Sequence, residues 1–209
     1  MTHLNVSPRV SKVCLILALT ALLQACAGGT QAPRLNYDFG APFGPLSKDL
    51  NQKPITLALS IADINAPSTL ESNAMLYRLH YDNQQTLRPY AQHRWSMPPA
   101  QLLTQRLKSR IAAAGGTVVS VTDGVADFPV LKIDLDEFSQ IFTAPGQSHA
   151  QITLRASLMK KNKLLAQHYF TLDTEAASAD APGGAKAMQV AADASISAIL
   201  IWLQSVTLN

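Results

Sequence analysis

The second half of the chain contains three long segments that are predicted to be strands, at residues 128–144, 149–159 and 164–176, and apolar and polar residues alternate over parts of them. Alternation with a period of two residues is typical of a β-strand that has one buried and one solvated face. Only the Lys-Lys-Asn-Lys sequence at residues 160–163 separates the last two segments, and it predicts a turn. Three consecutive strands of this length require a sheet, so the fold must be built around one.

Four shorter segments are also predicted to be strands. Residues 55–64 alternate apolar and polar residues, and residues 74–82 and 86–91 are predicted as a hairpin. Residues 117–122 form the last of the four. Pro89 has no backbone N–H to donate, and this places its strand at an edge of the sheet.

Two segments repeat apolar residues every three or four positions, which predicts helices with one buried face. The first follows the prolines at 98–99, has Ser96 as its predicted N-cap, and ends at the glycines at 115–116. The second is rich in alanine and spans residues 185–203. Its apolar character raises the alternative of membrane insertion, but polar residues such as Lys186 interrupt it, and packing against a sheet is the favoured interpretation.

The order of these elements is β-β-β-α-β-β-β-β-α. It predicts an α/β (α+β) fold, in which a mixed, largely antiparallel sheet carries two main helices in a layered α/β/α arrangement. A chain of 209 residues is long enough to bury one substantial core of this kind.

The N-terminus has the layout of a secretory signal peptide. Residues 1–25 contain Arg9 and Lys12 but no acidic residue, and residues 13–23 are almost wholly apolar. This run is shorter than the roughly 20 residues that span a bilayer, although a short membrane anchor or a buried helix are alternatives. Without Arg9 and Lys12 the 17 basic residues fall to 15, against 14 acidic ones. The remaining chain is therefore nearly neutral, which argues against nucleic acid as a partner.

The sequence Leu-Gln-Ala-Cys that ends at Cys26 resembles the bacterial lipobox, in which the cysteine becomes the lipidated first residue of the mature protein. Several acyl chains, palmitate among them, on Cys26 would hold the chain at a membrane where a single chain would be marginal. Ala27 stands where an Asp would retain a lipoprotein in the inner membrane, so the resemblance implies the outer membrane, facing the periplasm. Cys14 is lost with the leader, and no internal disulfide is then possible.

Residues 26–53, which begin with the lipidated cysteine, are rich in Gly, Pro, Asn and Gln and are predicted to form a flexible tether. As a coil it would average about 30 Å from end to end, and fully extended it would reach roughly 90 Å. Tyr37, Phe39 and Phe43 leave open that the segment docks on its own domain or on a neighbour. The predicted domain covers residues 54–209.

Motifs that would carry catalysis are absent from the sequence. There is no GxSxG, HExxH, GxxxxGK[ST] or GxGxxG pattern, so we expect no enzymatic activity and no cofactor. We also expect no metal, because the histidines lack ligand spacing. The five are His3, His80, His93, His149 and His168.

One acidic cluster, Asp134, Asp136 and Glu137, has two interpretations. Alternation puts Asp134 and Asp136 on one strand face, where they could share a cation or a proton. The simpler interpretation is that these residues line the solvated face while Ile133 and Leu135 fill the core.

The densest aromatic and basic stretch is Leu-Arg-Pro-Tyr-Ala-Gln-His-Arg-Trp-Ser-Met-Pro-Pro, residues 87–99. Its candidate site residues are Tyr90, Arg94 and Trp95. They could contact a partner or a lipid headgroup. In the favoured interpretation the aromatic residues anchor the corner between strand and helix, and the arginines are exposed.

This stretch and four other segments resemble the ABC-type transport auxiliary lipoprotein family. The other segments are MLYRLHY, LKIDLDEFSQIF, ITLRASLMKKNKLLAQHYF and the Ala-rich helix with its late Trp. The similarity covers residues 54–202, and its most specific part is the Tyr-Ala, Arg-Trp and Pro-Pro spacing. The Tyr-Asp-Phe-Gly sequence in the tether departs from the family pattern.

The resemblance implies an α/β/α envelope protein that assists movement of phospholipids or related hydrophobic molecules between two membranes. It implies association with an MCE-domain protein of an ABC transport system, and self-association, while ATP would bind elsewhere. The alternatives are a structural outer-membrane lipoprotein and a periplasmic lipid-acting enzyme. The missing nucleophile motif argues against the enzyme.

Overall fold

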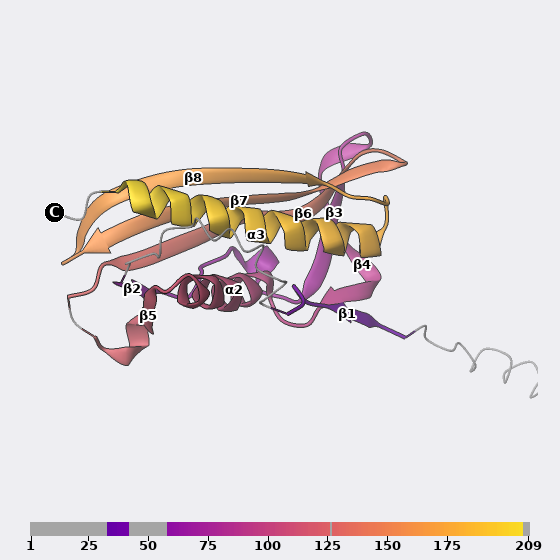
Figure 1. Ribbon diagram of the computed structural model, residues 1–209. Coiled ribbons are helices and arrows are strands. Elements are labelled where there is room, and N and C mark those ends of the chain that lie inside the picture. Colours follow the sequence, from indigo (N-terminus) through magenta and orange to yellow (C-terminus); the bar gives the residue numbers. More distant parts are fainter. Residues whose placement is uncertain (1–32, 42–57, 126, 207–209) are drawn as a thin grey trace, which may run out of the picture. The chain divides into compact units, whose positions relative to one another are not determined.

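The computed structural model describes residues 33–41, 58–125 and 127–206, and one compact unit begins at Arg34. Its elements follow the predicted order from β2 onward, with one additional short strand before them (Figure 1). They are β1 (Leu35–Tyr37), β2 (Ala58–Ile61), β3 (Ala74–Leu79), β4 (Asn83–Trp95), α2 (Pro99–Ala113), β5 (Thr117–Ser120), β6 (Val130–Ala144), β7 (Gln147–Lys160), β8 (Lys163–Glu175) and α3 (Ala181–Ser205).

The described strands form one eight-stranded mixed sheet organised around β6. On one side β6 pairs antiparallel with β7, and β7 pairs antiparallel with β8. On the other side β2 pairs parallel with the start of β6, while β3 pairs parallel with its end. β4 lies antiparallel to β3, and β1 and β5 add parallel partners to β4 and β2. The predicted mixed, largely antiparallel sheet with two main helices is therefore confirmed.

Local chemistry explains most of the boundaries. Lys161 and Asn162 both have positive φ values, of 49° and 61°, as a two-residue hairpin turn between β7 and β8 requires. β4 is longer than predicted, and Pro89 is tolerated in it because β1 pairs only with His93–Trp95 and leaves the other edge of Pro89 free of a described strand. The predicted cap by Ser96 is wrong. Pro98 occupies the N-cap of α2, and no side chain caps that end.

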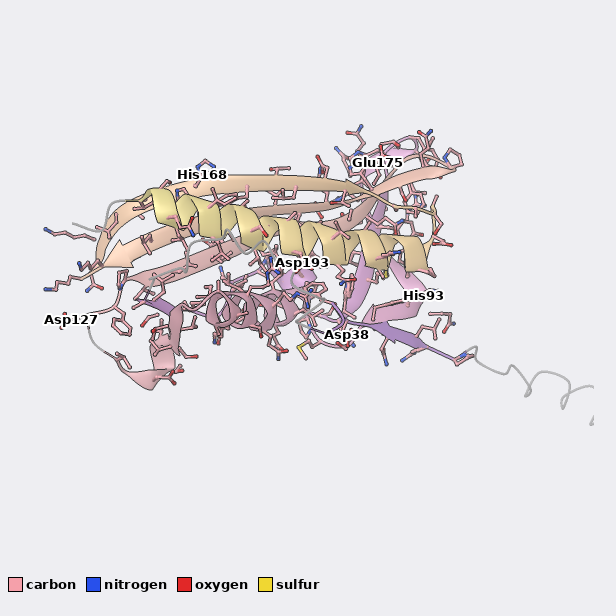
Figure 2. The ribbon with its side chains drawn as sticks, in the orientation of Figure 1. Asp38, His93, Asp127, His168, Glu175 and Asp193 are labelled. Atoms are coloured by element: carbon pink, nitrogen blue, oxygen red, sulfur yellow. The ribbon has the colours of Figure 1, made fainter. Side chains whose placement is uncertain are left out.

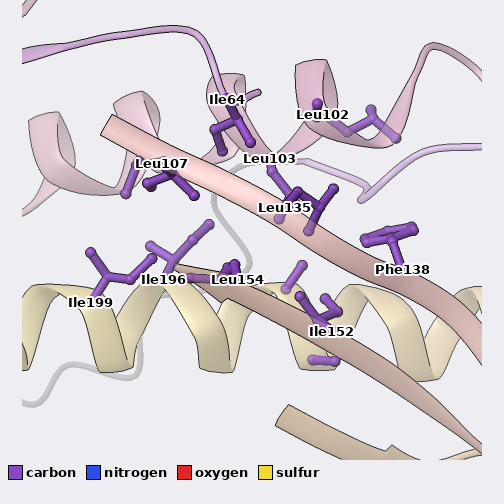
Figure 3. Close-up of a cluster of buried hydrophobic side chains, with 14 of the residues drawn as sticks. Ile64, Leu102, Leu103, Leu107, Leu135, Phe138, Ile152, Leu154, Ile196 and Ile199 are labelled. Atoms are coloured by element: carbon purple, nitrogen blue, oxygen red, sulfur yellow. The ribbon is translucent and has the colours of Figure 1, made fainter. Parts of the chain in front are cut away.

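The hydrophobic core lies between the two helices and the apolar face of β6 and β7 (Figure 3). Polar side chains of the same strands, such as Lys132 and Arg155, lie on the opposite face. β6 and β7 turn most of their apolar side chains to one face, and both helices pack on that face and contact each other, whereas an α/β/α layering would place helices on both faces. Core residues include Leu103 and Leu107 of α2, Leu135 and Phe138 of β6, Ile152 and Leu154 of β7, and Ile196 and Ile199 of α3.

α3 has the length and composition of a membrane-spanning helix. In the structure it lies along β7 and β8 (Figure 1), and the face that carries Met188, Ile196 and Leu203 is buried against the sheet. The predicted packing of this helix against a sheet is therefore confirmed.

Candidate functional site

Trp95 lies in the hydrophobic core at the corner where β4 ends and α2 begins. Its side chain is 1% exposed. The indole packs edge to face against Phe138 of β6 and Phe39, with ring centroids 5.5 Å and 5.9 Å away. A buried indole with two aromatic neighbours holds the corner together, and it presents no surface to a partner.

Residues 34–41, which were predicted to belong to the tether, are part of the compact unit. β1 pairs parallel with His93–Trp95 at the end of β4, and the backbone N–H of Ser96 donates to the carbonyl of Tyr37. Phe39 follows β1 and is 3% exposed. The sequence left open whether the aromatic residues of this segment dock on their own domain or on a neighbour. The structure shows that Phe39 docks on its own domain. Phe43 lies outside the described residues.

Arg106 connects residues 34–41 with both helices. It lies on α2 with only 6% of its side chain exposed, and its Nε and Nη2 atoms donate to the two carboxylate oxygens of Asp193 on α3, over 2.8 Å and 2.7 Å. Its Nη1 atom donates to the carbonyl of Ala41 over 2.7 Å. Asp193 projects between α3 and α2 (Figure 2). The planar guanidinium suits this two-pronged contact, and no lysine could replace it.

Tyr90 belongs to a polar network beneath the start of α3. Its hydroxyl donates to Oε1 of Gln140 over 2.9 Å. The amide of Gln140 donates in turn to Oγ of Ser148 and to the carbonyl of Asp180, the N-cap residue of α3. Burial, and then the charges of Tyr77 and Asp180, raise the pKa of Tyr90 above its usual range. The Tyr90 hydroxyl is therefore a hydrogen-bond donor and not a base at physiological pH.

Gly184 allows α3 to approach this network, which leads to a prediction. A Cβ at position 184 would overlap the side-chain amide of Gln140. Gly184→Ala should therefore lower the free energy of unfolding by about 1–3 kcal/mol, as overpacking of a core does. Gly146→Ala is the matched control, since no atom lies within 4 Å of its added Cβ. Denaturant titration of both variants measures the difference, and equal stabilities would contradict the close contact.

Arg94 lies apart from the contacts of Arg106 and from the hydrogen-bond network of Tyr90. Its Nη1 atom is 3.5 Å from Oδ1 of Asn73, and its buried Nε atom has no partner among the described residues. Tyr90, Arg94 and Trp95 thus contact three different parts of the fold. They do not converge on one ligand.

The acidic cluster on β6 does not form a shared cation or proton site. Asp134 accepts from Arg155 over 2.7 Å and from Asn65 over 3.1 Å, and the hydrogen bond from Arg155 contributes most to lowering the pKa of its carboxyl. A bulge at Asp136 breaks the alternation, and Glu137 pairs with Arg78 instead. The interpretation in which the two aspartates share a cation is therefore wrong, and each paired carboxylate is neutralised by its own arginine.

Two further features bear on ligand binding. Among the described residues no group of three or more His, Cys, Asp or Glu side chains could hold a metal ion. A groove of about 500 Å³ lies between residues 63–71 and the first half of α2. Asp63, Glu71 and Lys108 are among its lining residues, so the groove is unlike the mainly apolar cavities that hold an acyl chain.

Comparison with known proteins identifies the family of the chain. Residues 42–199 match the family model described as the ABC-type transport auxiliary lipoprotein component. The chain belongs to this family. The description names an auxiliary component of ABC-type transport and a lipoprotein, which suggests a membrane-anchored location in the cell envelope. No curated protein matches the sequence.

Solved structures share the fold of this auxiliary lipoprotein. A crystal structure of a Xanthomonas campestris protein assigned to the DUF330 family is 17% identical, with a TM-score of 0.62 over 84% of this chain and 87% of that one. A second crystal structure, of an uncharacterized protein, is 14% identical, with the same TM-score over 82% and 99% of the two chains. At these identities the likeness concerns the fold alone.

Cys26 lies outside the described residues of the auxiliary lipoprotein, and its lipidation stays a prediction. Seven residues, 27–33, separate it from Arg34, where the compact unit begins. A fully extended chain advances at most about 3.6 Å per residue, so Cys26 and Arg34 can lie no more than roughly 29 Å apart. This limit is far below the reach expected for a tether that ends at residue 53.

Proposed function

We propose that this auxiliary lipoprotein is anchored in the outer membrane through lipid on Cys26, faces the periplasm, and supports an MCE-type ABC transport system. In this role it assists the movement of phospholipids or related hydrophobic molecules between the two membranes. It acts by binding and not by catalysis. Self-association of the chain is part of the same proposal.

The observation that carries the proposal is the match of residues 42–199 to an auxiliary lipoprotein family, together with a lipobox-like cysteine just before the fold. The rigid attachment of residues 34–41 supports it. Phe39 is buried in the core and Arg106 holds the carbonyl of Ala41, so a short link from Cys26 would keep the domain within about 29 Å of its anchor. Such a domain is suited to receive a partner close to the membrane surface.

The described residues support a docking role more than a lipid-carrying one. The groove beside α2 has seven polar residues among the twelve that line it, and an acyl chain inside it would leave carboxylates and amides without water. The proposal therefore assigns the hydrophobic cargo to other components of the system.

Cross-linking in intact cells tests the partner. The chain, expressed at its native level and carrying a C-terminal affinity tag, would be cross-linked in the envelope and recovered in detergent. We expect an MCE-domain protein among the captured chains. Recovery of peptidoglycan without any transport component would favour the structural alternative.

Replacement of Cys26 by Ala tests the anchor. We expect Cys26→Ala to abolish acylation and to leave a precursor or a soluble periplasmic form with an unchanged free energy of unfolding, because the compact unit begins at Arg34. Binding to an isolated partner should persist, since anchoring raises only its effective concentration. Function in cells should fall, most at low expression. Full complementation by the variant at native expression would contradict a role for the anchor.

A further inference from the structure

Three lysines lie together where β7 turns into β8. Lys161 and Asn162 form the turn, and Lys160 faces Lys163 across the adjoining pair of the hairpin. Like charges directly opposite one another destabilise a strand pair. None of the three lysines forms an ion pair with another described residue. No ion pair in the described part of the chain therefore offsets the repulsion at this turn.

An apolar row crosses the sheet beside these lysines. Met159 faces Val130 of β6 on one side and Leu164 of β8 on the other. It is four residues from Arg155 along β7, so it shares the face opposite the helices. The next row on this face is polar and consists of Lys132, Ser157 and Gln167. A bulge at Leu165 follows the apolar row, and Leu164 and Leu165 are 54% and 36% exposed. Adjoining exposed apolar side chains indicate a contact surface.

The charge at this end of the molecule is positive overall. Lys132, two residues into β6, is exposed and adds to the three lysines of the hairpin. Asp123 and Asp127 lie between β5 and β6, and Figure 2 shows Asp127 in the loop before β6. Asp123 accepts from the backbone N–H of Ser120, and neither carboxylate forms an ion pair with a described residue. A partner at this end must therefore carry negative charge.

Anionic phospholipid matches both the lysines and the leucines. Lysine side chains attract the phosphates of anionic lipids, and leucines beside them can enter the apolar boundary beneath the headgroups. An acidic protein surface would match the lysines only, because it would place Leu164 and Leu165 against charged groups. Membership of a lipoprotein family also suggests a bilayer close to the chain.

We propose that the end of the β7–β8 hairpin, residues 159–165, rests on an anionic phospholipid bilayer, with Leu164 and Leu165 at the apolar boundary. The bilayer is the one that holds Cys26, because the link from Cys26 to Arg34 spans at most roughly 29 Å. β1 and the hairpin turn lie at opposite ends of the compact unit (Figure 1), so contact at both ends would lay the domain lengthwise on that membrane. The choice of membrane rests on the anchor in the proposed function, whereas the lipid contact itself does not.

Vesicle binding tests the lysines. The probes are vesicles of phosphatidylcholine alone and vesicles with about a quarter phosphatidylglycerol, and the full chain carries Cys26→Ala so that no acyl chain takes part. We expect binding to the anionic vesicles only. Lys161→Gln should weaken it about fivefold, and the triple variant with Lys160→Gln and Lys163→Gln about 100-fold, since each lysine near an anionic surface contributes about fivefold. Lys186→Gln, at an exposed position on α3, is the control and should stay within about twofold.

Replacement of a leucine separates a lipid from an acidic protein. Leu164→Gln should weaken binding to the anionic vesicles about tenfold, because the apolar contact is lost. Val190→Gln is the matched control, since Val190 is 50% exposed on α3 and far from the hairpin in sequence. Both positions are exposed, so both variants should keep the thermal midpoint of the parent chain. If Leu164→Gln bound like the parent, the surface would recognise charge alone, and the lipid assignment would be wrong.

The wild-type chain with lipid on Cys26 tests which bilayer is contacted. Reconstituted in the same anionic vesicles, it should leave them dispersed in light scattering, and clustering would place the hairpin on a second bilayer. Equal binding of the Cys26→Ala chain to neutral and anionic vesicles, or a triple lysine variant that binds like its parent, would overturn the lipid contact itself. The two vesicle-binding tests need neither the anchor nor transport, so failure of the proposed function would leave them standing.

Discussion

Trp95→Ala is expected to lower the free energy of unfolding by about 3–5 kcal/mol, the cost of removing a buried aromatic side chain. The indole is 1% exposed and contacts Phe39 and Phe138, which come from two segments that are distant in sequence. Its removal would leave a cavity that these rings cannot fill without moving the segment after β1. A domain of this size is stable by only about 5–15 kcal/mol, so the variant would approach its unfolding threshold.

Denaturant titration followed by far-ultraviolet circular dichroism measures this loss. Tyr81→Ala is the matched control, because that aromatic side chain is 48% exposed and its loss should change stability by less than about 0.5 kcal/mol. Partner capture measured on the same samples separates the two interpretations of Trp95. Unchanged stability with reduced capture would mean that Trp95 acts as a contact residue after all.

Deletion of residues 34–41 should destabilise the domain at least as much. The deletion removes Phe39 from the core, the backbone pairing of β1 with β4, and the carbonyl of Ala41 that accepts from Arg106. Loss of the Phe39 ring alone should cost about 3–5 kcal/mol. The buried guanidinium of Arg106 would in addition lose an acceptor, at a further cost of about 1–3 kcal/mol.

Deletion of residues 27–32 is the control, because the compact unit starts after them. This shorter deletion should leave the thermal midpoint unchanged while it brings the domain closer to Cys26. If both deletions leave the midpoint unchanged, residues 34–41 do not contribute to the core. The pair of variants also separates loss of reach from loss of folding, which shortening the whole of residues 27–53 would combine.

The alternation of apolar and polar residues predicts β2, β3, β6 and β7, because each of these strands places side chains of one face in the core. β1 could not be predicted in this way. It has only three residues, two of them exposed, and it is held by backbone pairing that leaves no pattern in the side chains. Phe39 was the one residue that indicated docking of this segment, because a large aromatic side chain among small and polar residues gains stability when it is buried.

The site was harder to predict because its contacts join residues far apart in the sequence. Arg106 and Asp193 are 87 positions apart, and nothing local indicates that they meet. The sequence nevertheless contains one indication of this contact. Arg106 falls between Leu103 and Leu107, on the face of α2 that the apolar pattern predicts to be buried. A charged residue on a buried face requires a partner. The pairing of the acidic cluster could not be predicted from the sequence either, since the bulge at Asp136 is a property of strand pairing.

The parallel pairing of β1 with β4 has a mechanical consequence. Tension from a lipid on Cys26 would enter the domain at Arg34, and a pull directed along β1 would act along the axis of that strand. Hydrogen bonds between the strands run across that axis, so they would be loaded together in shear and not opened one at a time. Phe39 and the Ala41 carbonyl that accepts from Arg106 come next along the chain. Their contacts with the core would resist the same force if the pairing of β1 were lost. The domain would then move as one body when its partner pulls it away from the membrane.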